Sequence, residues 1–352
     1  MLELPGGQTT MIGSMPHATA EEAFKALEKF PLNIPSWPQL PQRSFLEGMI
    51  PQCSEGFPGI QYDPSQRRIS IQRDNQLVQS MADFYEHVIN DNAQALAISE
   101  TYANGLHYFL GQLRESSSPL PFVKGQITGP FTFGLGLNDQ EKTPVWFDEQ
   151  YRDIVLKGLS LKAQWLIREL ENYAQQVLLF MDEPILSAIG TPAYIAISDE
   201  QVIAGLNEVI LAAHDAGALV GIHCCGNMDW GLLARTEVDI IAFDAYFYGD
   251  KIALYPELIE SFLQRGGILA YGLVPTLEPD VLEKETLSSL QTRLESLLER
   301  FVNKGITENR LRRQMLFTPS CGMGSGSLTR QQTQHVLELL AGLSCCPLVE
   351  SH

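Results

Sequence analysis

The sequence predicts an α/β fold of the (β/α)8 barrel type, in which eight buried parallel strands alternate with amphipathic helices. Eight short apolar runs occur along the chain, and amphipathic stretches with helical periodicity lie between most of them. Continuous apolar runs of this length are typical of strands that are buried on both faces of a parallel sheet. An open, doubly wound sheet is the alternative arrangement of the same elements.

The expected strands and helices follow one another in a regular order. Each of the eight runs is interpreted as a strand, and they cover residues 9–16, 93–100, 121–130, 177–184, 218–225, 239–248, 267–275 and 314–322. Thr19 and Glu22 have the spacing of a capping box, which places the start of the first helix there. Further helical patterns cover residues 155–176, 199–216 and 282–304.

Residues 31–76 interrupt this alternation. The segment is rich in proline, and a hairpin pattern around Asp63, Pro64 and Ser65 lies near its end. We therefore expect one barrel over residues 1–352, with residues 31–76 as an insertion after the first helix. The insertion is predicted to form a lid over the barrel mouth; a surface excursion that only packs against the barrel is the alternative.

Composition excludes several classes of protein. Of the 352 residues, 45% are hydrophobic, which is too many for a disordered chain. The 24 Lys and Arg residues against 42 Asp and Glu residues give a net charge of 24 − 42 = −18, which argues against nucleic-acid and membrane partners. No apolar run approaches the ~18 residues of a membrane span, and the N-terminal sequence lacks a signal-peptide pattern. A cytoplasmic protein is expected.

Polar and ligand-type side chains stand at the ends of the expected strands. In a barrel the carboxyl ends of the strands build the active site. The candidates in chain order are Ser14, His17, Glu100, Gln126, Thr128, Asp182, Glu183, His223, Cys225, Asp244, Tyr271, Thr276 and Cys321.

Three of these residues suggest a metal site. His223 and Cys225 are two residues apart on one strand, so both side chains point to the same face. Cys321 adds a third soft ligand, and three such ligands with an open fourth position are typical of catalytic zinc. A core histidine beside a buried thiol is the alternative. Asp244 either supplies an oxygen atom as a fourth ligand or only accepts a hydrogen bond next to the metal site.

Two neighbouring carboxylates, Asp182 and Glu183, end the fourth strand. Alternation sends one to the interior and the other to the wall, where a helix N-terminus could bind it. We assign Asp182 to the interior. Glycines at 322, 324 and 326 lack the spacing of a nucleotide-binding loop and indicate a tight turn. No role is assigned to the remaining thiols of Cys53, Cys345 and Cys346.

Together these motifs resemble the C-terminal catalytic barrel of cobalamin-independent methionine synthase. They also resemble the wider superfamily that contains the corrinoid-linked thiol methyltransferases and uroporphyrinogen decarboxylase. The resemblance rests on five short motifs in the same order, which are TTMIGSMP, GQITGPFTF, MDEP, His223-Cys224-Cys225 and Cys321-Gly322.

The resemblance implies a role for each matched residue. His223, Cys225 and Cys321 would bind Zn²⁺, and Asp244 stands where the family has a glutamate ligand. Asp182 would bind the amino group of an amino-acid thiol such as homocysteine. Glu100, which begins the looser pattern of Glu100, Asn104, Tyr108 and Phe109, would assist it, and Ser14 would contact the substrate carboxylate through its backbone.

Two departures from the family bear on the methyl donor. Members that use folate carry a second barrel ahead of this one, and they carry a histidine on the seventh strand where this chain reads AYGLVPT. Both departures favour methylcobalamin, or a methylated corrinoid on a carrier protein, as the donor.

The function predicted from the sequence is therefore a zinc-dependent transfer of a methyl group from a methylated corrinoid to a small thiol, most simply homocysteine. One alternative is transfer to coenzyme M, whose sulfonate Asp182 would repel. Others are a non-catalytic barrel that binds a thiol or a corrinoid, and a decarboxylase of a porphyrin-like acid. The last requires basic residues at the mouth, for which the candidates are Arg43, Arg67, Arg68 and Arg73.

Overall fold

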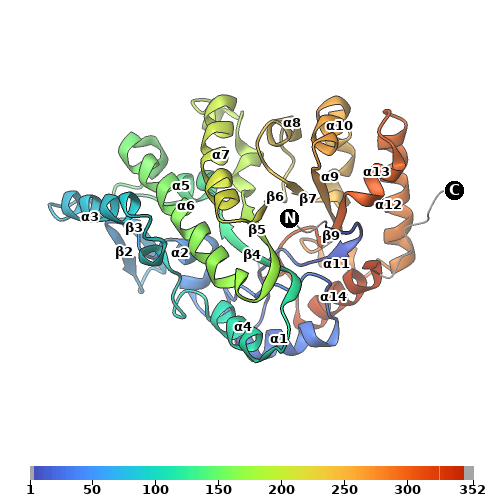
Figure 1. Ribbon diagram of the computed structural model, residues 1–352, viewed down its shortest axis with the longest axis horizontal. Coiled ribbons are helices and arrows are strands. Elements are labelled where there is room, and N and C mark those ends of the chain that lie inside the picture. The colour runs from blue at the N-terminus through green and yellow to red at the C-terminus, as the bar shows by residue number, and fades with distance from the viewer. Residues whose placement is uncertain (1–3, 325, 345–352) are drawn as a thin grey trace.

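A curled, parallel, seven-stranded sheet forms the centre of the protein in a computed structural model, which describes residues 4–324 and 326–344. Figure 1 shows the strands at the centre with the helices around them. The strand order is β1-β9-β8-β7-β6-β5-β4, and all six strand pairs are parallel. The strands are β1 (Gln8–Thr9), β4 (Leu120–Thr128), β5 (Ala174–Asp182), β6 (Leu219–Cys224), β7 (Ile240–Phe243), β8 (Ile268–Val274) and β9 (Met315–Pro319).

The predicted α/β fold with buried parallel strands is confirmed, but the prediction of a closed eight-stranded barrel is wrong. The predicted strand at 93–100 is a 3-10 helix, Ala93–Leu96, followed by an irregular segment. Within the described residues, β1 and β4 form the two edges of the sheet and do not pair with each other. The protein is therefore barrel-like but not closed by a continuous ladder of hydrogen bonds.

Residues 34–39 fill the gap between the two edge strands. On one side the amides of Ile34 and Gln39 donate to the carbonyl oxygens of Thr9 (3.0 Å) and Gly13 (3.1 Å). On the other side the amide of Lys124 donates to the carbonyl of Pro35 at 2.9 Å. The contacts include isolated parallel bridges to both edges. Part of the segment predicted as an insertion therefore lies in the place expected of the second strand.

Helices follow most of the strands, as predicted. The pattern at 199–216 corresponds to α7 (Asp199–Asp215), and those at 155–176 and 282–304 to α6 (Glu149–Glu171) and α12 (Leu287–Val302). Thr19 caps α1 (Ala20–Lys29), because its Oγ1 accepts from the amide of Glu22 at 3.2 Å. The others are α2 (Met49–Cys53), α3 (Leu77–Ile89), α4 (Asn104–Glu115), α5 (Pro130–Gly136), α8 (Trp230–Ala234), α9 (Ala245–Ile252), α10 (Pro256–Gln264), α11 (Pro279–Leu282), α13 (Glu308–Arg313) and α14 (Arg330–Ser344).

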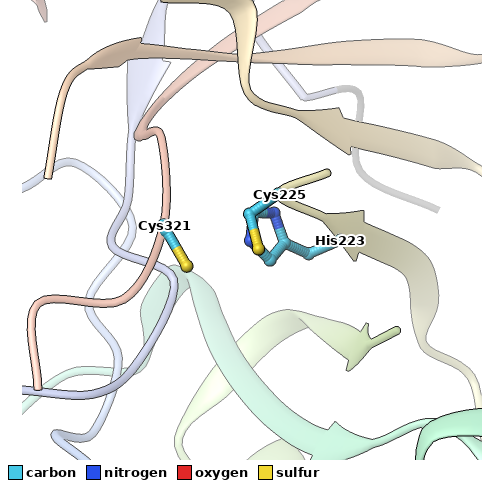
Figure 2. A group of neighbouring side chains, drawn as sticks. All are labelled: His223, Cys225 and Cys321. Carbon is cyan, nitrogen blue, oxygen red and sulfur yellow. The ribbon is translucent and has the colours of Figure 1, made fainter. Parts of the chain in front are cut away.

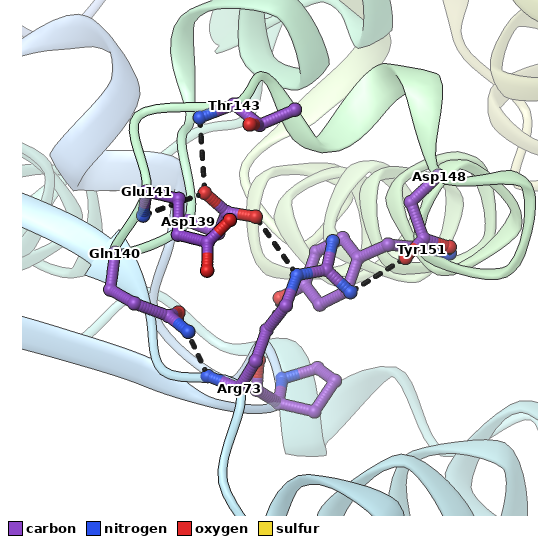
Figure 3. A network of polar contacts seen from close by, with 8 residues as sticks. Arg73, Asp139, Gln140, Glu141, Thr143, Asp148 and Tyr151 are labelled. Carbon is purple, nitrogen blue, oxygen red and sulfur yellow. Dashed lines mark hydrogen bonds and ion pairs between the residues drawn. The ribbon is translucent and has the colours of Figure 1, made fainter.

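The predicted hairpin is present as β2 (Ile60–Asp63) and β3 (Arg68–Ile71), which pair antiparallel. Just beyond it, Arg73 binds two carboxylates of the connection between α5 and α6 (Figure 3). Its Nε donates to Asp139 Oδ2 at 3.0 Å, and its Nη1 to Asp148 Oδ2 at 2.6 Å. These ion pairs, with the bond from the Ile71 amide to the Asn138 carbonyl (2.9 Å), fix the hairpin to residues 138–148. The predicted function of the segment as a lid stays a prediction.

The side chains inside the sheet form an apolar floor. Most come from alternate positions of neighbouring strands, one lies before β1, and one lies in the segment 34–39. They are Leu4, Ile34, Phe122, Leu178, Phe180, Leu219, Ile240, Ala242, Ile268, Ala270 and Leu316. A larger apolar cluster lies between the sheet and the helices. In the part of the chain that the structure describes, no helix combines the length and the apolar character that a membrane span requires.

The packing of α4 against the gap-filling segment gives a stability prediction. A Cβ atom added to Gly105 would lie 1.9 Å from the carbonyl oxygen of Pro38, whereas one added to Gly111 of the same helix meets nothing within 4 Å. Gly105→Ala should lower the free energy of unfolding by about 1–3 kcal/mol through overpacking. Gly111→Ala should raise it by about 0.5–1 kcal/mol. Urea denaturation measures both, and equal stabilities of the two variants would contradict the described contact.

Candidate metal centre

The parallel register brings three polar residues side by side at the carboxyl end of the sheet. Thr128 of β4 is paired with Asp182 of β5, which is paired in turn with His223 of β6. Directly paired residues of neighbouring parallel strands point to the same face. On β5, Leu178 and Phe180 belong to the apolar floor, so Asp182 continues the interior face above them.

His223, Cys225 and Cys321 form a compact group at this end. Their potential ligand atoms all lie within 4.8 Å of one another. His223 is 3% exposed, and the two cysteines are half-buried. Figure 2 shows that His223 and Cys225 come from one segment and that Cys321 reaches them from another. The predicted juxtaposition of these three side chains is therefore present; His223 is on β6, Cys225 follows its end directly, and Cys321 lies two residues beyond the end of β9.

The environment of the imidazole fits a metal. Neither Nδ1 nor Nε2 of His223 has a hydrogen-bond partner among the described residues, although both atoms are buried. An unpartnered polar atom costs free energy in the interior, so buried imidazole nitrogens are normally hydrogen-bonded or coordinated. One imidazole and two thiols are soft ligands of the kind that Zn²⁺ accepts.

The two thiols of the group differ strongly in acidity. The hydrogen bond from Cys321 and the neighbouring His223 lower the pKa of Cys225 to about 4, although burial opposes the shift. The same contact with Cys225 raises the pKa of Cys321. These opposite shifts favour a thiolate at Cys225 and a protonated thiol at Cys321 in the metal-free protein. Burial raises the pKa of Cys224 to about 12, which leaves its thiol neutral.

Asp182 and Glu183 point to opposite sides of β5, as the sequence predicted. The buried carboxylate of Glu183 accepts from the amides of Phe131 and Thr132, both at 2.8 Å, and from the Thr132 hydroxyl at 2.7 Å. It therefore binds the start of α5, and burial raises its pKa to about 7. Oδ1 of Asp182 is buried without a partner among the described residues, and burial raises the pKa of Asp182 to about 6.

Asp244 lies near the metal-binding group but outside it. Its Oδ1 accepts from the amide of Phe247 at 2.9 Å, which caps α9. Its Oδ2 is buried and has no partner within the described chain. Burial raises the pKa of Asp244 to about 7. Among the described residues, Asp244 is not in the set whose ligand atoms lie within 4.8 Å of one another, so its direct ligation stays a prediction.

Ser14 contacts the loop that carries Cys321. Its Oγ accepts from the amide of Gly324 at 3.1 Å, and its carbonyl accepts from the amide of Met323 at 2.8 Å. A Cβ atom at Gly322 would lie 2.2 Å from Ser14 Oγ, so glycine is needed there for close approach. The predicted contact between Ser14 and a substrate stays a prediction.

Glu100 stands apart from the group. Its side chain is exposed, and its carboxylate accepts from Asn104 Nδ2 at 3.0 Å. No hydrogen bond joins it to His223, Cys225 or Cys321 in the described ranges. Its predicted role beside Asp182 is also untested.

Lys124 is an interior residue that the sequence analysis missed. It is fully buried on β4, and its Nζ donates to the carbonyl of Ile12 (2.7 Å) and to Gln126 Oε1 (3.1 Å). Its Nζ also lies 4.9 Å from the ring centroid of Phe180. Burial lowers the pKa of Lys124 to about 7, while the charge of Asp182 opposes the shift. The signal was present in the sequence, because Lys124 shares the alternation of Gln126 and Thr128.

Comparisons with known proteins support the fold. No family model matches the sequence, and no curated protein matches it. A B12-independent methionine synthase from Shewanella sp. W3-18-1, solved with selenomethionine, is similar in structure, with a TM-score of 0.58 and 15% identity over 96% of this chain and 97% of that one. A candidate vitamin-B12-independent methionine synthase from Listeria monocytogenes has a TM-score of 0.50 and 13% identity over 92% and 84% of the two chains. The chain therefore has a methionine-synthase-like fold.

The acidity of Cys225 gives a pH prediction for metal-free protein. Since its pKa is held near 4, Cys225 should be a thiolate at both pH 6 and pH 8, and iodoacetamide should alkylate it at similar rates. For an ordinary thiol with a pKa of about 8.5, the thiolate fraction at pH 6 is roughly 80-fold lower than at pH 8. Peptide mapping by mass spectrometry measures the rate at Cys225, with buried Cys224 as the unreactive control. An 80-fold fall at Cys225 would contradict the described thiol pair.

Proposed function

We propose that the chain is a thiol S-methyltransferase of the methionine-synthase type, with His223, Cys225 and Cys321 as the ligands of a zinc ion and homocysteine as the acceptor. The observation that carries the proposal is the meeting, at the carboxyl end of the sheet, of two thiols and one imidazole that has no partner among the described residues. The similarity of the fold to B12-independent methionine synthase supports it.

The donor set favours thiol chemistry. A zinc ion held by His223, Cys225 and Cys321 would lower the pKa of an incoming thiol, so that a nucleophilic thiolate would be available near neutral pH. The low pKa of Cys225 means that one protein ligand is deprotonated before a metal binds. Two thiolate ligands reduce Lewis acidity, so activation of water for hydrolysis is the less suitable reaction.

Asp182 is the residue that would select an amino-acid thiol. Its Oδ1, which has no partner in the described part of the chain, lies on the interior face beside His223, in a site of low exposure. A substrate ammonium would give this carboxylate a charge-assisted partner, whereas the sulfonate of coenzyme M would be repelled. The backbone of Ser14 is proposed to bind the substrate carboxylate, and Glu100 to assist Asp182 with the amino group.

The methyl donor is proposed to be methylcobalamin, either free or on a corrinoid carrier protein. The seventh predicted strand is β8, and its end reads AYGLVPT. It lacks the histidine that the resemblance associates with folate. The thiolate would attack the methyl carbon in line, so that the carbon–sulfur bond forms as the bond to the corrinoid breaks.

Metal content and activity together test the proposal. Purified protein should contain about one zinc per chain and transfer a methyl group from methylcobalamin to homocysteine. Cys225→Ser and Cys321→Ser should each lose both properties. Cys224→Ser is the matched control, because its thiol points away to the Gly226 carbonyl and should leave both intact. Unchanged zinc content in the first two variants would refute the ligand assignment, and zinc without methyl transfer would refute the activity.

The role of Asp182 can be tested separately with paired acceptors. Asp182→Ala should lower kcat/KM for homocysteine about 10- to 150-fold, which corresponds to the loss of one charged hydrogen bond. 4-Mercaptobutyrate, which lacks the ammonium group, should be turned over equally by both proteins. Equal turnover of homocysteine and coenzyme M, unchanged in the variant, would contradict this role.

A further inference from the structure

A cavity away from the metal-binding group lies between the β2–β3 hairpin, α2 and the loop after α5. Its volume is about 570 Å³, within the range of small-molecule sites. The apolar part of its lining consists of Phe45, Ile50, Pro51 and Ile69. Phe45 stacks on Tyr62 with ring centroids 5.7 Å apart and an interplanar angle of 10°, so it offers a planar apolar surface.

Three cationic side chains also line this cavity, and they are Arg67, Arg68 and Lys142. All three are exposed, and none forms an ion pair with another residue of the described ranges. Asp63 lies opposite Arg68 in the hairpin and its charge attracts Arg68, but the two side chains do not form an ion pair within the described chain. Three unpaired cations on one cavity are unexpected in a chain with a net charge of −18.

The one acid among the described lining residues does not neutralise these cations. Asp139 uses both carboxylate oxygens elsewhere, as Figure 3 shows. Its Oδ2 accepts from Arg73 Nε, and its Oδ1 accepts from the amides of Glu141 (2.9 Å) and Thr143 (3.0 Å). Asp139 shares Arg73, which lies outside the lining, with Asp148, so the lining itself holds three cations and one acid that is bound elsewhere.

Two of the cations sit on backbone that a glycine would adopt more easily. Arg67 has a φ of 47° and Lys142 a φ of 67°. The left-handed region costs a residue with a Cβ atom about 1 kcal/mol.

Arg67 also lies over the ring of Phe45, with 6.0 Å from the Arg67 Cζ atom to the ring centroid. Cationic and aromatic groups therefore meet on the same wall of the cavity.

We propose that this cavity binds a small organic anion with an apolar ring body. The anionic group contacts Arg67, Arg68 and Lys142, and the ring lies on Phe45 and the apolar lining. Attraction to three cations in a partly enclosed apolar site gives such a ligand both affinity and orientation. The proposal does not depend on the metal centre or on methyl transfer.

Paired fluorescent probes test both halves of this site. 8-Anilinonaphthalene-1-sulfonate carries an anion on an aromatic body, and N-phenyl-1-naphthylamine is its uncharged counterpart. The triple variant Arg67→Gln, Arg68→Gln, Lys142→Gln should weaken sulfonate binding about tenfold, as expected for the loss of three exposed charge contacts. Binding of the uncharged probe should not change. A second variant, Phe45→Ser, should weaken binding of both probes.

A control triple variant removes the same net charge elsewhere. Lys25, Lys251 and Lys304 are exposed and lack ion pairs within the described chain, and their replacement by Gln should leave binding of both probes unchanged. Far-UV circular dichroism confirms that each variant is folded. The proposal is overturned if the wild-type protein binds no sulfonate probe, if both triple variants weaken it equally, or if the first triple variant leaves it unchanged.

Discussion

The parallel register of β4, β5 and β6 determines which side chains meet at the carboxyl end of the sheet. Thr128, Asp182 and His223 are directly paired across three strands. If the pairing register of β5 shifted by one residue, Asp182 would point toward the helices and Glu183 toward the interior. Glu183 resists such a shift, because its three hydrogen bonds hold it against α5. The position of His223 therefore depends on strand pairing, whereas Cys225 and Cys321 lie just beyond the ends of β6 and β9.

The interior above the apolar floor is unusually polar for a protein core. Four residues on or just after the strands carry buried polar atoms that have no partner within the described ranges. They are His223 on β6, Asp182 (Oδ1) on β5, Asp244 (Oδ2) after β7 and Thr318 (hydroxyl) on β9. Each would cost free energy if it stayed without a partner. Such a cluster is destabilising by itself, and a bound metal and substrate would supply the missing partners. Lys124 adds a buried ammonium that links β4 to the carbonyl of Ile12 beyond β1, near the gap that residues 34–39 fill.

Sequence patterns predicted the parts of the fold that depend on long buried strands. The runs that became β4 to β9 are continuous and apolar, and alternation along them placed His223 and Cys225 together. The second strand was placed wrongly for a physical reason. Pro35 and Pro38 have no amide hydrogen, so residues 34–39 make isolated bridges and show no strand-like pattern. The run at 93–100 begins with Ala-Gln-Ala-Leu, whose residues favour helix, and it forms a 3-10 turn. The separation of Glu100 from the metal ligands depends on this turn, and alternation could not predict it.

We propose that His223, Cys225 and Cys321 hold one zinc ion and leave a position for a thiol. X-ray absorption spectroscopy of the zinc-loaded protein can measure this coordination, because it counts sulfur neighbours at about 2.3 Å. We predict two sulfur ligands in the protein alone and three after homocysteine is added. A site that shows no sulfur ligand, or one whose sulfur count does not change with homocysteine, would contradict this coordination.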